Sequence, residues 1–287
     1  MSVRIAYLIL VHKSPAHLVR LVQRLQGPER VFVIHLDSKI ADPSWDDARR
    51  KLAQSNVLWT ERVHCEWGEF GLVQAMLNSM ETLCGSGFSF DFAVLLSGQD
   101  YPIKTNEYID HYLAARSGKC LMYVHPFPND EWKWQGYYRL ATWRISLFGK
   151  KRRVIPARFS KLFHRPIPLG YRPYGGSTWW ALPNAAIHYI RDFVKNNPDF
   201  VRYFQQVIYS DEMMFHTILG NSPFRPQTGN HYLYFMKWSS DPHPAILTDA
   251  DLPALRATEK CFARKFDDGV DAVILDAIDR EFLRSSE

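Results

Sequence analysis

Two short segments of this 287-residue chain carry side chains that suit the same reaction. Residues 210–212 are Ser-Asp-Glu at the start of a helical run, and residues 262–267 set Arg264 and Lys265 inside an apolar frame. A carboxylate such as Glu212 can take a proton from a hydroxyl, and fixed cations can hold a departing diphosphate. Each charge-assisted hydrogen bond to such a diphosphate contributes roughly 1.5–3 kcal/mol. The two segments therefore predict displacement of a diphosphate, with Glu212 as the general base.

Each of these groups also has a purely structural explanation. Acidic residues are favoured in the first turn of a helix by its dipole, which would account for Glu212 alone. An Arg-Lys pair is usually a solvated surface feature. Here Phe262 and Phe266 flank the pair, which indicates packed side-chain stems and aimed charges.

The sequence does not favour a bound divalent metal. Glu212 and His216 have i,i+4 spacing, but a third ligand is not evident, so we expect His216 in the core. Asp249 and Asp251 follow Thr248 and precede an apolar run, which is typical of helix initiation rather than of a metal site at a strand end. We therefore expect no metal and no other cofactor.

The elements that must position these groups begin with a β-α-β unit. Residues 5–11 and 31–36 are apolar runs of the kind buried on both faces of a parallel sheet, and residues 15–25 repeat apolar side chains at helical spacing. The right-handed crossover rule makes the two strands parallel neighbours. In such sheets ligands bind beyond the carboxyl ends of the strands, which is where His12 and Asp37 fall.

The rest of the chain continues the α/β pattern. An irregular aromatic, basic and proline-rich stretch over residues 122–174 interrupts it, with neither a repeat nor a low-complexity linker. A single domain over 1–287 is the simplest organisation, with a nucleotide-binding half (1–120) and an acceptor and catalytic half (121–287). The further predicted elements are helices at 46–55, 71–83, 105–115 and 184–196, and strands at 90–96 and 178–182.

Two aspartates at strand ends have open roles. Asp37 is either a cap or loop carboxylate, or a hydrogen-bond acceptor for a nucleoside base or ribose. Asp100, in the turn at 98–102, has the same two alternatives.

Composition limits the possible partners and location. The net charge of +5 suits acidic ligands such as nucleotides, but it is too weak to indicate nucleic acid without a basic stripe. The four cysteines have no framework spacing and are expected to be free thiols, and no apolar run is long enough for a membrane span. We expect a cytoplasmic protein.

The strongest charge feature is the segment 150–165. Its cations alternate with Phe159, Leu162 and Phe163. This pattern suits an exposed basic loop, a contact for an acidic or lipid-linked acceptor, or an anionic membrane surface, with roughly 1 kcal/mol per cation near such a surface. Peripheral contact of Lys150–Arg165 with the inner face of the plasma membrane is therefore one expectation.

A series of motifs along nearly the whole chain resembles the family of Core-2/I-branching β-1,6-N-acetylglucosaminyltransferases and protein O-xylosyltransferases, as a bacterial-type member. The motifs at 175–180 and 211–223 are more similar to the xylosyltransferase branch. In chain order, the matching segments are 7–12, 33–37, 65–68, 95–105, 175–180, 211–223 and 262–267.

This resemblance implies a GT-A-like fold, an α/β architecture with a mostly parallel central sheet flanked by helices. It also implies inverting, metal-independent transfer from a UDP-sugar to a glycan or lipid-linked saccharide, with Glu212 as the base. The acceptor side is expected to include Trp179, Trp180 and Asp211. The donor set that it implies is Val11, His12, Asp37, Trp67, Asp100, Thr178, Thr248, Arg264 and Lys265.

One departure bears on the donor sugar. Where xylosyltransferases have an acidic residue after Gly-Gly-Ser, this chain has Thr178. N-acetylglucosamine and xylose therefore both stand as donor sugars. The rival hypothesis from another class is a carbohydrate- or nucleotide-sugar-binding protein that keeps the fold without turnover.

Overall fold

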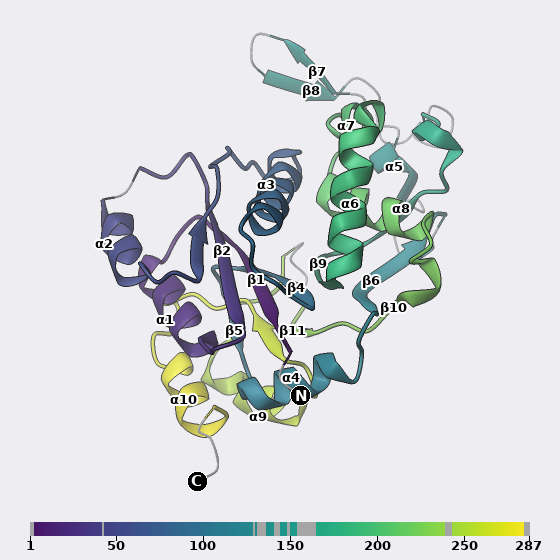
Figure 1. The fold of residues 1–287 in the computed structure, drawn as a ribbon. Helices are drawn as coiled ribbons and strands as arrows, with labels where there is room; N and C mark the ends of the chain where they lie inside the picture. The colour runs from purple at the N-terminus through teal and green to yellow at the C-terminus, as the bar shows by residue number, and fades with distance from the viewer. Residues whose placement is uncertain are drawn as a thin grey trace.

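The computed structural model describes residues 3–41, 43–128, 130, 136–140, 144–147, 150–153, 165–238 and 243–283. A seven-stranded sheet forms its centre, in the order β10-β6-β9-β4-β1-β2-β3 (Figure 1). Its strands are β1 (Ile5–Val11), β2 (Arg30–Leu36), β3 (Val57–Trp59), β4 (Phe92–Ser97), β6 (Cys120–Pro126), β9 (Tyr174–Pro183) and β10 (Thr228–Gly229).

The sheet is mostly parallel. β1 pairs in parallel with both β2 and β4, while β9 is antiparallel to both β4 and β6. The predicted α/β class, with a mostly parallel central sheet flanked by helices, is confirmed. Because β9 from the second half of the chain lies between β4 and β6, the two predicted halves share one sheet.

Helices cover both faces of the sheet, and β1 shows how. Ile5, Tyr7 and Ile9 belong to one hydrophobic cluster, whereas Ala6 and Leu8 belong to the other, as the two-residue period of a strand requires. The first cluster includes side chains of α1 (Pro15–Leu25), α2 (Ser44–Lys51), α4 (Asn106–Ala114), α9 (Leu252–Ala257) and α10 (Ile274–Glu281). The second includes side chains of α3 (Gly71–Gly85), α6 (Asn184–Asn196), α7 (Pro198–Phe204) and α8 (Met214–Gly220).

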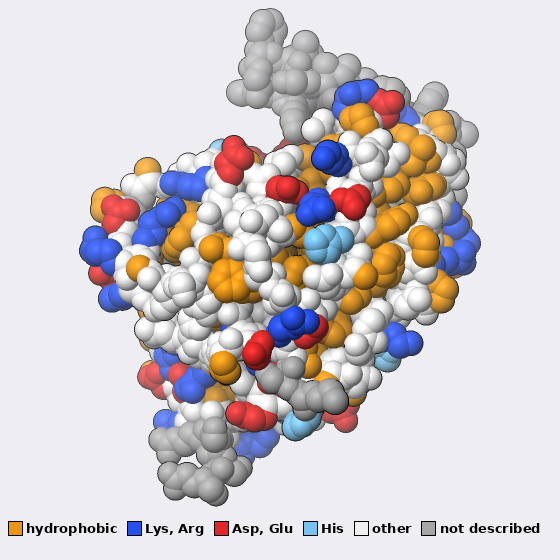
Figure 2. All heavy atoms as spheres, in the orientation of Figure 1, with side chains coloured by type: hydrophobic (Ala, Val, Ile, Leu, Met, Phe, Trp, Pro, Cys, Tyr) orange, Lys and Arg blue, Asp and Glu red, His pale blue; other side chains and the backbone are white. Residues whose placement is uncertain are grey.

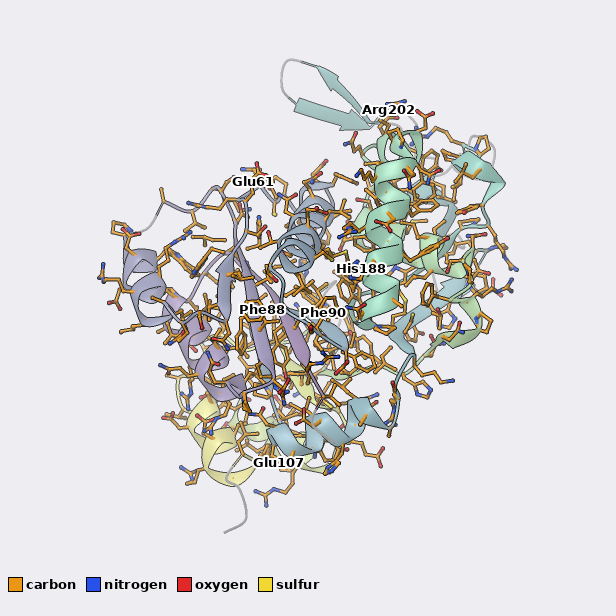
Figure 3. The ribbon with its side chains drawn as sticks, viewed as in Figure 1. Glu61, Phe88, Phe90, Glu107, His188 and Arg202 are labelled. Atoms are coloured by element: carbon orange, nitrogen blue, oxygen red, sulfur yellow. The ribbon has the colours of Figure 1, made fainter. Side chains whose placement is uncertain are left out.

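Contacts between these layers are visible in the side chains. Figure 3 shows Phe90, just before β4, beside His188 of α6, with stacked rings 6.3 Å apart. On the face that carries α3 and α6, basic and acidic side chains are interspersed (Figure 2).

A small second sheet holds the predicted cation pair. It runs β11-β12-β5, where β11 is Tyr234–Met236, β12 is Phe262–Arg264 and β5 is Asp100–Pro102. Arg264 is the register partner of Asp100 across the antiparallel pair. Other described elements include a hairpin of β7 (Arg144–Leu147) and β8 (Lys150–Arg153) and the short helix α5 (Tyr137–Leu140).

Most predicted elements agree with the structure, but the helix predicted at 46–55 covers Ser44–Lys51, β3 was not predicted, and the segment around the candidate base differs. Glu212 does not lie in the first turn of the following helix. Residues Ser210–Glu212 form a separate 3-10 turn, and α8 begins at Met214. The break has a backbone cause, because Tyr209 before the turn is left-handed (φ 52°) and Met213 after it is non-helical (φ −134°).

Candidate active site

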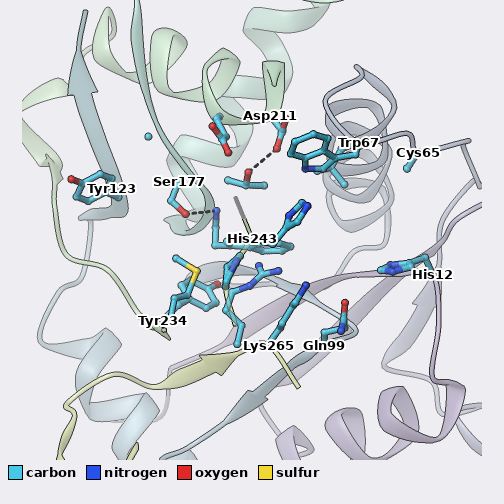
Figure 4. Close-up of a pocket in the computed structure, with 18 of the residues that line it drawn as sticks. His12, Cys65, Trp67, Gln99, Tyr123, Ser177, Asp211, Tyr234, His243 and Lys265 are labelled. Carbon is cyan, nitrogen blue, oxygen red and sulfur yellow. Dashed lines mark hydrogen bonds between the residues drawn. The ribbon is translucent and has the colours of Figure 1, made fainter. Parts of the chain in front are cut away.

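A single pocket of about 1150 Å³ brings together residues from both halves of the chain. It opens where β1, β2 and β4 end, which is where open α/β sheets bind ligands. It is lined by most of the predicted site residues, namely His12, Asp37, Trp67, Thr178, Trp179, Asp211, Glu212, Arg264 and Lys265. Figure 4 shows Asp211 and Trp67 on one side of the pocket, and Lys265 and Gln99 on the opposite side.

The cation wall is built on β12. Arg264 is buried, and its guanidinium carbon lies 3.8 Å from the centre of the Trp179 ring. Its Nε is 3.6 Å from Asp100 Oδ1, which is close enough for charge attraction but too far for a hydrogen bond. Among the described residues, Arg264 Nε and Nη1 have no hydrogen-bond partner. Buried guanidinium N–H groups of this kind suit an anionic ligand.

Lys265 adds the second charge. Burial lowers its pKa, and the nearby Arg264 and Lys13 cations lower it further. The backbone around the pair is held by Gln99, whose carbonyl accepts from Phe266 N (2.9 Å) and whose side chain donates to Phe266 O (3.0 Å). Two like charges are thus fixed beside each other, and a bound anion would relieve their repulsion.

Asp100, for which a nucleoside contact and a loop carboxylate were the two alternatives, lies outside the pocket lining. It is fully buried and accepts hydrogen bonds from Ser97 N (2.8 Å) and Ser97 Oγ (2.7 Å). Burial raises its pKa, an effect that the Arg264 charge opposes. Its place is beneath Arg264, where it orients the cation.

The carboxylate wall consists of Asp211 and Glu212. Thr178 Oγ1 donates to Asp211 Oδ2 at 2.7 Å. The pKa of Asp211 is raised to about 6, chiefly by burial and then by the charge of Glu212. Glu212 is about one-third exposed (32%) and receives a hydrogen bond from Arg139 of α5. The 3-10 turn thus presents one restrained and one accessible carboxylate.

The loop that carries Trp67 is tied to this turn. Trp67 is 66% exposed, and its ring meets those of Tyr209 (4.9 Å) and His243 (5.1 Å) edge-on. Tyr209 N donates to Gly68 O at 3.0 Å. Because Gly68 has φ +74° and a Cβ there would lie 3.0 Å from the Tyr209 ring, this position requires glycine.

The nucleotide end contains His12 and Asp37. Asp37 Oδ1 accepts from Lys39 N (3.0 Å) and Cys65 N (3.4 Å), so this carboxylate shapes its loop while it also faces the pocket. Burial lowers the pKa of His12, as do the nearby Lys13 and Lys39 cations. A neutral imidazole beside a carboxylate suits hydrogen bonding to a nucleoside.

Three other predicted residues lie outside the pocket lining. Val11 is buried against Gly98, and its carbonyl accepts from Asp37 N (2.9 Å). Trp180 is fully buried with its ring edge-on to Phe215, so it cannot stack on a sugar, contrary to expectation. Thr248 caps the turn at 249–251, as the helix-initiation pattern predicted, and its side chain is engaged there.

Several residues that line the pocket were not singled out from the sequence. Arg139 gives no sequence signal, because it stands in the irregular stretch between 122 and 174. Trp238 and His243 follow β11, and only their chemical type could have indicated them. All three line the pocket because tertiary contacts bring them close to residues that are distant in the sequence.

Two findings concern the described residues only. Within them, no group of three or more His, Cys, Asp or Glu side chains is arranged to hold a metal ion. No helix among them is both long enough and apolar enough to cross a membrane. In the segment Lys150–Arg165, residues 154–164 lie outside the described residues, so the predicted membrane contact stays a prediction.

The chain is similar to known sugar-transferring enzymes. It is 26% identical over 303 residues to Xylosyltransferase oxt of Drosophila melanogaster, covering 95% of this chain and 33% of that protein. It is 28% identical over 245 residues to Xylosyltransferase 2 of Rattus norvegicus (83% and 27%). It is 27% identical over 293 residues to Beta-glucuronosyltransferase GlcAT14A of Arabidopsis thaliana (98% and 64%). The chain therefore spans about a third of the xylosyltransferases and under two-thirds of the plant protein.

Among solved structures, the PaToxG Glycosyltransferase matches with a TM-score of 0.31 and 12% identity, over 76% of this chain and 69% of that one. The model of the Core-2/I-Branching enzyme family matches residues 5–258, which include every residue of the carboxylate wall. The chain belongs to the Core-2/I-branching enzyme family, a family of glycosyltransferases.

Proposed function

We propose that this protein is an inverting, metal-independent glycosyltransferase that moves N-acetylglucosamine or xylose from a UDP-sugar to a hydroxyl of a glycan or lipid-linked saccharide. The observation that carries this proposal is the opposition of charges across the pocket. Carboxylates at 211–212 occupy one wall, and the buried guanidinium of Arg264 with Lys265 occupies the other.

In the proposed reaction, Glu212 takes the proton of the acceptor hydroxyl. The hydroxyl oxygen forms a bond to the anomeric carbon from the face opposite UDP, and the bond between that carbon and the phosphate oxygen breaks. The electron pair stays on the departing UDP, where Arg264 and Lys265 stabilise it. General-base catalysis contributes about 10²–10⁴ in rate, and electrostatic stabilisation of a leaving group is of similar size.

The other pocket residues support the same arrangement. We assign Asp37 and His12 to the uridine, because both line the pocket beyond the ends of β2 and β1. The exposed Trp67 and Trp238 at the pocket offer flat apolar surfaces, on which sugar rings commonly stack. Trp179 contributes by supporting Arg264, because the guanidinium covers its ring.

The test is the variant Glu212→Gln. We expect it to abolish sugar transfer while UDP affinity stays near that of the wild type, because the base acts on the acceptor and not on the nucleotide. A thermal-shift screen of UDP-sugars selects the donor, and UDP release measures turnover. Turnover within threefold of the wild type would contradict the role of Glu212. A wild-type protein that binds UDP-sugars and turns none over with any glycan acceptor would instead favour the binding-protein hypothesis.

A further inference from the structure

One carboxylate oxygen of the candidate base already accepts a hydrogen bond from within the protein. Arg139 Nη1 donates to Glu212 Oε2, and the Arg139 side chain is only 12% exposed. Arg139 comes from α5, which is 73 residues before Glu212 in the chain. A charge-assisted bond of this kind is among the stronger hydrogen bonds in proteins.

The same turn that carries Glu212 also holds the guanidinium in place. The Arg139 guanidinium carbon lies 4.9 Å from the centre of the Tyr209 ring. Glu212 N in turn donates to Tyr209 O at 3.0 Å. Arg139 thus contacts both the candidate base Glu212 and the ring of Tyr209. Asp211 is a second carboxylate near the Arg139 guanidinium.

The hydrogen bond from Arg139 to Glu212 has a consequence for catalysis, because the pocket is open to water. Water is small enough to reach any bound UDP-sugar, and a general base that is free in such a pocket would activate water as readily as an acceptor hydroxyl. Water would then lose its proton to Glu212 and bond to the anomeric carbon as UDP leaves, which wastes the donor. An acceptor that binds across the pocket brings its own contacts, whereas water cannot compete with a guanidinium for the carboxylate.

We propose that Arg139 is a positioning residue that restrains Glu212 until an acceptor docks, and so suppresses hydrolysis of the donor. This inference rests on the proposed function. The acceptor hydroxyl displaces Arg139 from one carboxylate oxygen, and the guanidinium then holds the other oxygen in the orientation needed for proton removal.

The experiment measures UDP release from UDP-N-acetylglucosamine and from UDP-xylose without any acceptor. We expect Arg139→Ala to release UDP about 10-fold faster than the wild type, since it frees part of the general-base effect. Arg139→Lys, which keeps the charge, should stay near the wild type. The double variant Arg139→Ala/Glu212→Gln should fall to the wild-type rate or below, because the gain needs the base.

A matched control is Arg202→Ala. Arg202 lies on α7 outside the pocket lining, pairs with Asp199 three residues earlier on the same helix, and is labelled in Figure 3. Its loss should leave the hydrolysis rate unchanged. A purely structural role for Arg139 would lower the rate or leave it unchanged, and would not raise it.

The inference is overturned if Arg139→Ala hydrolyses the donor no faster than the wild type while its UDP affinity, measured by titration calorimetry, is unchanged. Should alanine unfold the protein, Arg139→Gln keeps the length of the side chain and gives the same test. Failure of the proposed function shows separately, as a wild-type protein that does not bind UDP or that transfers no sugar to any glycan acceptor.

Discussion

At the residue scale, neighbouring carboxylates of one turn are given different environments. Asp211 is buried and bonded to Thr178, whereas Glu212 faces the pocket. Burial, and after it the charge of Glu212, raise the pKa of Asp211 to about 6. Such separation is how a site assigns different tasks to chemically similar groups.

The raised pKa of Asp211 predicts a pH-dependent stability. Below pH 3.8, the ordinary pKa of the group, Asp211 is protonated in both the folded and the unfolded protein. Between pH 3.8 and about 6 only the folded protein holds this proton, so the stability that the proton contributes is lost as the pH rises through about 6. Asp211→Asn, which can still accept the Thr178 hydrogen bond, should therefore raise the melting temperature at pH 8 by about 2–4 °C and have less effect at pH 5.

Differential scanning fluorimetry at the two pH values measures this difference. The control is Asp192→Asn, whose side chain is mostly exposed. An equal shift for Asp211→Asn at both pH values would show that the carboxylate is not held protonated by the fold.

The cation pair gives a second prediction at this scale. Removing Lys265 from a partly desolvated site should cost about 2–4 kcal/mol of transition-state stabilisation, or roughly 30- to 1000-fold in turnover. Activity should survive excess EDTA, because the positive charge comes from side chains. Lys13→Ala is the matched control, since Lys13 pairs with Asp267 (2.6 Å) beside the pocket but does not line it. If EDTA stops turnover and Mn²⁺ restores it, a metal carries the role assigned to Lys265.

At the element scale, the site depends on contacts between short irregular segments. The loop with Trp67 and Gly68 is bonded to the turn that carries the base, through Tyr209. Tyr209 is itself left-handed, so this turn has little freedom to relax. A substitution in the loop with Gly68 should therefore shift the turn that carries Glu212.

Gly68→Ala tests this link. We expect it to lower stability by about 1–3 kcal/mol and to reduce turnover, because the new methyl group would press on the Tyr209 ring. Gly87→Ala is the matched control, since Gly87 has φ +79° but no atom within 4 Å of a Cβ. It should show the backbone strain alone and keep full turnover per folded molecule. Equal turnover for the two variants would show that the contact with Tyr209 does not position the base.

At the scale of the whole molecule, the last helix is tied to the first. Asp279 of α10 accepts from Arg20 Nη2 (2.7 Å), Arg24 Nε (2.8 Å) and Tyr101 Oη (2.9 Å). Beneath it, Ile274, Leu275 and Ile278 join the hydrophobic cluster that also includes α1. These contacts hold α10 next to α1 on one face of the sheet (Figure 1).

Asp279→Asn should therefore destabilise the protein by about 1–3 kcal/mol, because it removes the carboxylate charge that Arg20 and Arg24 share. Asp276→Asn is the control, since Asp276 also pairs with Arg20 (2.6 Å) but its side chain is 64% exposed, against 21% for Asp279. Urea unfolding of both variants measures the difference. Equal free energies of unfolding would mean that the network adds nothing beyond surface pairing.

Local patterns in the sequence predicted most of the elements and the charged groups of the site. Apolar runs and helical spacing are local patterns, so the strands at 5–11 and 31–36 and the helix at 184–196 could be predicted without any contact information. In the structure the second strand begins one residue earlier, at Arg30. The ends of parallel strands meet at one edge, which is why His12 and Asp37 were expected to meet. The positive charges of Arg264 and Lys265, and the apolar residues that flank them, likewise predicted a contact with a diphosphate from the sequence.

Which of these groups face the pocket depends on tertiary contacts. Side chains alternate along β9, but its antiparallel insertion between β4 and β6 determines that Trp179 faces the pocket and Trp180 the opposite core. Asp100 lies beneath Arg264 because β5 and β12 pair across more than 160 residues of sequence, and Arg139 reaches Glu212 in a comparable way. Local periodicity fixes elements, whereas burial and pairing depend on how distant strands assemble, which no local pattern encodes.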